Sequence, residues 1–325
     1  MTNSPGYGPD VLGPDFEQRV LPQPPDYEGP VRSTLVRLRA AGTAGCPAVL
    51  YVHGFNDYFF QEELARRYQQ RGHAFYALDL RKYGRSWLPH QRPNHVRALR
   101  EYYADLDAAL AVLRAEGHPA VVLHGHSTGG LLAALYAQDG PGRGAVAALV
   151  LNSPFLALYL PWWQRRVALP LAAALGRFAP ELPLPGAVPP HYGQSLHRAY
   201  RGEWAYHLPW KPVAVFGVTA GWARAIAAGH RRVRRGLGLL LPVLVLHADR
   251  TVRTRGWSEA YFHADGVLDV RAIRALAPRL GPRVSVRAVA GGMHDLMLSR
   301  QPAREHAYRE LFTWLRQVLG EARGV

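Results

Sequence analysis

The sequence predicts an α/β fold with a mainly parallel central sheet and helices on both faces. Short apolar runs alternate with longer stretches of helical periodicity along most of the 325 residues. Several of these runs are continuously apolar, which is typical of strands buried on both faces of a parallel sheet. With 48 % hydrophobic residues, the chain can fill a large core.

The elements before the central motif follow from their apolar patterns. Residues 33–40 alternate and residues 46–54 form a continuous apolar run, so both predict strands. A helical pattern over 61–72 closes on Gly72, a typical C-cap, and a strand follows at 73–80. The first thirty residues are rich in Pro, Gly and Asp, and we expect an irregular arm there.

A long amphipathic helix is expected at residues 94–117, capped by Asn94 and ended by Gly117. Its apolar stripe, spaced as one face of a helix, consists of Val96, Leu99, Tyr103, Leu106, Leu110 and Leu113.

Strands at 120–126 and 145–153 enclose a helix at 128–138. The alternation then stops at residues 154–238, a block rich in Trp, Tyr, Pro and Arg without strand periodicity. It resumes with a strand, a helix, a strand and a final amphipathic helix at 241–248, 267–281, 283–290 and 303–320. We therefore expect one domain whose two parts, 1–153 and 239–325, are separated by an insertion at 154–238.

The composition of the chain limits the classes of binding partner that we expect. The net charge is +15, but the arginines are dispersed and no nucleic-acid-binding motif accompanies them, so we expect no nucleic-acid partner. The one dense basic cluster, RRVRR at 231–235, is compatible with peripheral contact to an anionic membrane surface. The single cysteine, Cys46, excludes an internal disulfide and a cysteine-based zinc site. No secretory leader or membrane span is recognised, and we expect a cytoplasmic protein.

The stretch AVVLHGHSTGG, residues 120–130, contains a G-x-S-x-G match centred on Ser127. An expected strand precedes it and an expected helix follows, which is the setting in which this motif forms a nucleophile elbow. The sharp turn needs small neighbours, here Gly125 and Gly129, and lifts the serine hydroxyl above the sheet at a helix N-terminus. Ser127 is therefore the candidate nucleophile.

A serine nucleophile needs a base, which in this arrangement follows the last strand. His294, in GGMHDL after the strand at 283–290, is the candidate. His53, His124 and His126 fit this place less well, because they end a strand or lie beside the serine.

The acid that would orient the base has several candidates. Asp249 directly follows the strand at 241–248, whereas Asp265 precedes the helix before the last strand. We favour Asp265, with residues 250–264 as an insertion between strand and acid. Asp249 is the main alternative, followed by Asp269 and Asp295.

Backbone N–H groups are expected to hold the oxyanion. One donor would come from Thr128, directly after the nucleophile, and the other from Phe55, after LYVHG. Asn56 and Asp57 either orient this loop or cap the next helix, and capping is the favoured interpretation.

The motifs YVHGF, YALDLRKYGRS, GHSTGG and GGMHDL, in this order, resemble the α/β-hydrolase superfamily. More narrowly they resemble its serine-hydrolase branch of monoacylglycerol lipases, lysophospholipases and serine aminopeptidase-like proteins. DLRKYGRS is similar to the D-x-R-G-x-G-x-S loop of that branch. The acid region departs from the usual pattern of an acid just after its strand.

The resemblance implies an α/β-hydrolase fold, a cap over the site at residues 154–238, and no cofactor or metal. Clustered aromatic and aliphatic residues in this block suit an apolar acyl or aryl pocket. We therefore expect a serine hydrolase that cleaves small or medium carboxylic esters of apolar acyl or aryl groups through an acyl-enzyme. Acyl transfer, thioester or amide cleavage, and non-catalytic ligand binding on the same scaffold are the alternatives.

Overall fold

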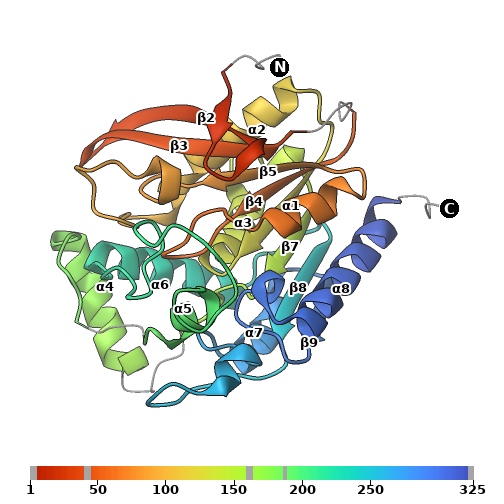
Figure 1. The fold of residues 1–325 in the computed structure, drawn as a ribbon. Helices are drawn as coiled ribbons and strands as arrows, with labels where there is room; N and C mark the ends of the chain where they lie inside the picture. Colours follow the sequence, from red (N-terminus) through yellow and green to blue (C-terminus); the bar gives the residue numbers. More distant parts are fainter. Residues whose placement is uncertain (1–5, 40–44, 159–163, 186–188, 321–325) are drawn as a thin grey trace.

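The computed structural model describes residues 6–39, 45–158, 164–185 and 189–320, which form one nine-stranded sheet in the order β1-β2-β3-β5-β4-β6-β7-β8-β9 (Figure 1). Strands β4 to β9 pair in parallel, and β1, β2 and β3 are antiparallel to their neighbours. The predicted mainly parallel α/β fold is confirmed. The strands are β1 Gly8–Asp10, β2 Gly13–Asp26, β3 Gly29–Leu38, β4 Ala48–Val52, β5 Ala74–Asp79, β6 Val121–His126, β7 Val146–Asn152, β8 Val243–Ala248 and β9 Val284–Val289.

Helices cover both faces of this sheet (Figure 1). Alternate residues of β4 face opposite sides: Leu50 packs in the core with α2 and α3, and Tyr51 packs in the core with α1 and α8. Strands β4, β5, β6 and β8 are buried along their whole length and so on both faces, which explains their continuous apolar runs. The helices are α1 Glu62–Gln69, α2 Tyr103–Ala115, α3 Thr128–Asp139, α4 Leu169–Phe178, α5 His191–Leu196, α6 Ala220–Arg235, α7 Val270–Leu276 and α8 Gln301–Leu319.

The expected irregular arm at the N-terminus is wrong, because residues 8–26 form β1 and β2. Strand β1 pairs with β2 only as far as Gln18, so the later part of β2 has a neighbour on one side alone. Prolines are tolerated on such an edge, where an N–H is not needed for a ladder. The proline-rich stretch therefore reflects an edge strand.

The expected helix start at Asn94 is also wrong, because α2 begins at Tyr103 after a single 3-10 turn. Asn94 has φ +62°, and its N–H bonds to the Lys82 carbonyl at 3.1 Å, so it belongs to a turn. Glu101 accepts the N–H groups of Arg97 and Ala98, both at 2.8 Å, and so begins the helical segment later. The predicted apolar stripe is buried throughout.

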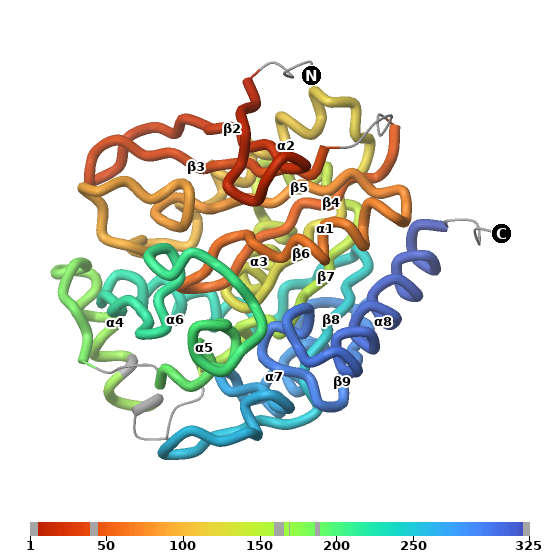
Figure 2. Tube along the Cα trace, viewed as in Figure 1, coloured from red at the N-terminus to blue at the C-terminus, as the bar shows by residue number. Residues whose placement is uncertain are grey.

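The chain between β7 and β8 carries α4, α5 and α6, seen at the lower left of the trace in Figure 2. Helix α6 packs Trp222, Ile226 and Val233 into the same core as α2 and α3. Helix α6 therefore lies within residues 154–238 in sequence and packs against the core in space. Within the described residues, no helix combines the length and apolarity needed to cross a bilayer.

Candidate active site

Ser127 stands between β6 and α3 in a backbone conformation that serine rarely adopts, with φ +53° and ψ −116°. Its N–H donates to the Asn152 carbonyl at 3.0 Å, and its own carbonyl accepts from Phe155 N–H at 2.9 Å. The end of β7 and the residues after it therefore hold the turn. Such strain costs on the order of 1–3 kcal/mol and persists where the surroundings enforce it, often at functional sites.

The glycines around Ser127 are required by close backbone packing. A Cβ atom at Gly125 would lie 2.5 Å from the Gly129 carbonyl oxygen, and one at Gly129 would lie 2.3 Å from the carbonyl oxygens of Val52 and His53. The elbow thus presses against the end of β4. This is the physical reason for small residues on either side of the serine.

The loop after β4 lies directly against Ser127. A Cβ atom at Gly54 would approach the Ser127 Cβ at 3.0 Å. Phe55 follows this glycine, packs on the Trp222 ring at 4.5 Å, and lines the same cavity as Ser127. Thr128 is the first residue of α3.

Asn56 and Asp57 do not cap α1, whose N-cap position is Gln61, so the capping interpretation is wrong. Asn56 has φ +53° and bonds twice to the insertion: its Nδ2 donates to the Pro212 carbonyl at 3.0 Å, and its Oδ1 accepts from Phe216 N–H at 3.1 Å. Asp57 accepts from Lys211 Nζ at 2.6 Å. These residues join the loop after β4 to the insertion.

The chain after β8 leaves the sheet edge and returns to it at Asp265. Thr251 and Asp265 pair as a parallel bridge, with Val252 N–H donating to the Asp265 carbonyl and Asp265 N–H donating to the Arg250 carbonyl, each at 2.9 Å. Asp265 therefore lies just beyond the end of β8, although residues 249–264 separate it from the strand in sequence. This excursion explains the unusual spacing of the acid region.

Asp265 contacts His294. Its Oδ2 lies 2.9 Å from His294 Nδ1, and its Oδ1 accepts from Val267 N–H at 2.8 Å and Leu268 N–H at 2.7 Å. Complete burial by itself raises the pKa of Asp265, but the His294 ring and the two N–H groups outweigh it and leave the pKa lowered. The carboxylate is thus ionised and fixed against the ring.

The three other candidate acids, Asp249, Asp269 and Asp295, bond to groups other than His294. Asp249 is exposed and accepts from Gly291 N–H at 3.1 Å, and Asp269 caps α7 through Arg271 N–H. Asp295 is buried and accepts from Asn152 Nδ2 at 2.7 Å.

The other histidines are held by neighbours away from Asp265. His53 Nε2 accepts from Leu80 N–H at 3.1 Å, and His124 Nδ1 lies 3.0 Å from the Tyr68 hydroxyl. Burial lowers the pKa of His53 and brings that of His124 to about 3. His126 stacks on His294 with ring centres 4.9 Å apart. None of the three contacts Asp265 in the described structure.

A cavity of about 110 Å³ joins these parts. Ser127, His294 and Phe55 line it from the sheet side, and residues of the insertion close it from the other. Tyr192 of α5 places its ring edge against His294, with ring centres 5.4 Å apart, and its hydroxyl accepts from Asp295 N–H at 3.0 Å. The remaining lining is mostly apolar: Pro189, Leu196, Tyr206, Pro212, Val213, Val215 and Val267.

Sequence reasoning missed Tyr192 and Lys211, because both belong to the block without recognisable periodicity. For Tyr192 no sequence signal was available. Lys211 is one of only two lysines in a chain of 39 basic residues, and this rarity was the available signal. Within the described part of the chain, no three His, Cys, Asp or Glu side chains are grouped to hold a metal ion.

A family model described as "Serine aminopeptidase, S33" matches residues 45–301 of the 325. Among solved structures, a monoglyceride lipase from Saccharomyces cerevisiae is similar with TM-score 0.68 and 16 % identity, covering 92 % of this chain and 94 % of that one. A monoacylglycerol lipase from Paleococcus ferrophilus is similar with TM-score 0.64 and 20 % identity, covering 85 % and 97 %. At these identities the likeness shows the fold.

A curated relative, Epoxide hydrolase 4 of Mus musculus, is 32 % identical over 130 residues, covering 40 % of this chain and 34 % of the relative. Its counterpart from Homo sapiens is 31 % identical over 119 residues, covering 35 % and 30 %. The chain therefore spans about a third of the length of these curated relatives.

Proposed function

This chain belongs to the serine aminopeptidase S33 family of α/β hydrolases, as its motifs predicted, and we propose that it is a serine hydrolase that cleaves carboxylic esters through an acyl-enzyme. The observation that carries the proposal is the pair His294–Asp265 at 2.9 Å, with His294 on the wall of the cavity that also contains Ser127. A serine on a strained elbow, a histidine and a buried carboxylate have the properties required for nucleophile, base and orienting acid.

In the proposed mechanism, Ser127 Oγ attacks the ester carbonyl carbon while His294 Nε2 accepts the hydroxyl proton. Asp265 holds Nδ1 protonated and stabilises the imidazolium. The N–H groups of Phe55 and Thr128 bind the oxyanion of the tetrahedral intermediate. His294 then protonates the leaving alcohol as the C–O bond breaks.

Deacylation repeats these steps with water as the nucleophile. His294 accepts a proton from water, the hydroxide adds to the acyl carbon, and collapse of the second tetrahedral intermediate returns the proton to Ser127 Oγ. No cofactor is required by this sequence of steps. Transfer to a second alcohol, or cleavage of a thioester or amide, would use the same groups.

The mostly apolar wall supports esters with apolar acyl or aryl groups, such as monoacylglycerols, lysolipids and small alkyl or aryl esters. The similarity to Epoxide hydrolase 4 does not favour epoxide opening. That chemistry uses a carboxylate as the nucleophile, and this chain has a hydroxyl at Ser127.

Intact-mass labelling with a fluorophosphonate tests the proposal. We expect the wild-type chain to gain one phosphonyl group at Ser127, and Ser127→Ala to gain none and to lose ester turnover. An unlabelled wild type that still binds ligands, with the same affinity in Ser127→Ala, would instead favour a non-catalytic binding protein.

We also propose that residues 154–238 include a cap over the site, and that this region contacts anionic membrane surfaces. The support for contact is a row of exposed apolar side chains along α4 and the turn before it, at Val167, Leu171, Leu175 and Phe178, together with the exposed arginines at 231, 234 and 235. Flotation with phosphatidylglycerol vesicles should show binding that falls steeply with salt. Binding that ignores salt, or none, contradicts this contact.

A further inference from the structure

The use of lysine in this chain is selective. Among 39 basic residues only Lys82 and Lys211 are lysines, and both are buried, with 1 % and 8 % exposed. Both are paired with carboxylates. A buried ammonium group requires such partners, because the loss of hydration would otherwise be too costly.

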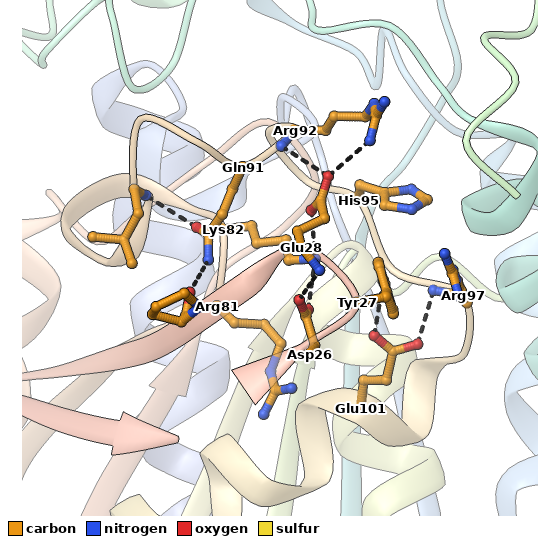
Figure 3. Close-up of polar contacts among 12 residues, drawn as sticks. Asp26, Tyr27, Glu28, Arg81, Lys82, Gln91, Arg92, His95, Arg97 and Glu101 are labelled. Atoms are coloured by element: carbon orange, nitrogen blue, oxygen red, sulfur yellow. Dashed lines mark hydrogen bonds and ion pairs between the residues drawn. The ribbon is translucent and has the colours of Figure 1, made fainter. Parts of the chain in front are cut away.

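Figure 3 shows the groups that surround Lys82, one of the two buried ammonium groups. Its Nζ lies 2.7 Å from Asp26 Oδ2 and 2.7 Å from Glu28 Oε2, and it stands 4.4 Å from the centre of the Tyr27 ring. The side chain is fully enclosed. Two carboxylates therefore fit around one ammonium group without solvent.

Lys211 has one carboxylate partner where Lys82 has two. Its Nζ lies 2.6 Å from Asp57 Oδ1, the single carboxylate that it contacts among the described residues. The Phe60 and Tyr206 rings stand 5.5 and 5.7 Å away. An ammonium group has three N–H donors, and this one donates a single hydrogen bond in the described structure.

Lys211 lines the cavity that also contains Ser127 and His294. Asp57 and Lys211 are the charged pair on a wall that is otherwise mostly apolar. The cavity volume is about 110 Å³, which is small beside the roughly 300–1,000 Å³ of pockets that bind drug-sized ligands, so only a short group fits between Lys211 and Ser127. A group bound at Lys211 would therefore lie only a few atoms from an ester carbonyl at Ser127.

We propose that Lys211 binds a carboxylate on a short arm of the substrate, so that the preferred esters are small and anionic. This rests on the proposed serine-hydrolase function and narrows its substrates from apolar esters in general to short esters that carry one carboxylate. Asp57 holds the ammonium group at the wall before substrate arrives, and the substrate carboxylate supplies the second partner that Lys82 has within the protein. The net charge of +15 also favours the approach of anionic substrates.

Two matched pairs of esters test the proposal, one for each arm of the ester bond. Monoethyl succinate and ethyl levulinate differ in the acyl arm, where a methyl group replaces one carboxylate oxygen. Acetoxyacetate and acetoxyacetone differ in the same way in the alcohol arm. Acid release in a pH-stat gives kcat/KM for each ester.

We expect the wild type to prefer the anionic member of at least one pair, and Lys211→Met to reduce that preference by about tenfold or more. Lys211→Arg should retain part of it. Because Lys211→Met leaves Asp57 buried and unpaired, the double variant Lys211→Met/Asp57→Asn separates loss of recognition from loss of folding. Arg198→Met removes one exposed charge from the same block, and should keep the preference.

Equal or lower kcat/KM for the anionic member of both pairs, or a preference that Lys211→Met leaves unchanged, would overturn the inference. The proposed function would survive that outcome if the neutral esters are hydrolysed and Ser127 is labelled. Absence of turnover on all four esters together with absence of labelling would overturn both.

Discussion

Asp265 and His294 are 29 residues apart in the chain, yet Asp265 Oδ2 lies 2.9 Å from His294 Nδ1. The contact exists because the chain after β8 makes an excursion and returns to pair Asp265 with Thr251 at the end of that strand. Asp249, which has the usual position for an acid in sequence, is exposed and bonds to Gly291 N–H. The path of the backbone thus brings Asp265, and not Asp249, into contact with His294.

We predict that Asp265→Asn lowers kcat/KM for a small ester by about 10³- to 10⁴-fold, because the imidazole loses the partner that fixes its tautomer. Asp249→Asn should change it by about threefold at most, as expected for an exposed group outside the cavity. Steady-state kinetics and the rate of fluorophosphonate labelling measure both. A larger loss in Asp249→Asn would identify Asp249 as the acid.

Asn56 is predicted to position the oxyanion loop. Its side chain bonds to Pro212 and Phe216 while its backbone has φ +53°, directly after the proposed donor Phe55. Asn56→Ala should lower kcat about 10- to 100-fold with KM little changed, since loss of oxyanion donors affects the transition state.

Asn56→Gly is the matched control for this prediction, because glycine accepts the positive φ without a side chain. If Asn56→Gly retains wild-type kcat, the backbone conformation matters and the two side-chain bonds do not. An increase in KM at constant kcat in both variants would assign Asn56 to substrate binding instead.

The packing of the elbow predicts that Gly129→Ala is destabilising, since the new Cβ would lie 2.3 Å from the carbonyl oxygens of Val52 and His53. Backbone atoms of a central strand cannot move away cheaply, so the free energy of unfolding should fall by about 1–3 kcal/mol or more. Urea denaturation measures this. Gly144→Ala, where no atom lies within 4 Å of the added Cβ, should stay near the wild-type value.

Burial brings the pKa of His124 to about 3, below its ordinary value of 6.5. Between these values the unfolded chain binds a proton that the folded chain does not, so stability is present above about pH 6.5 and is lost as pH falls toward 3. From pH 7 to pH 5 this one group should lower the free energy of unfolding by about 2 kcal/mol.

His124→Gln should therefore reduce the loss of stability between pH 7 and pH 5, measured by urea denaturation at each pH. His90→Gln, at an exposed position, controls for the removal of a histidine. Equal pH dependence in wild type and His124→Gln would show that His124 is not the group that resists protonation.

The sequence by itself determined most helices and strands, and also the G-x-S-x-G motif, which lies within one turn of the chain. Alternating and continuous apolar runs predicted the order of strands from β3 onward. This is possible because the burial of a strand produces an apolar pattern within a few consecutive residues. The elbow was predictable for the same reason, since the close contacts that require Gly125 are with Gly129 and Gly130 of the same turn. The composition of residues 8–26 was misleading, because an edge strand tolerates prolines that an irregular segment also contains.

Only the tertiary structure decided which distant side chains meet. The choice between Asp249 and Asp265 depended on where an excursion of the backbone returns, and that return is a pairing between Thr251 and Asp265 with no local pattern. The same holds for Asp57 and Lys211, which are 154 residues apart and meet at 2.6 Å. The partner of a buried lysine cannot be read from the sequence around it. It depends on how the insertion packs on the edge of the sheet, and this packing is a property of the whole chain.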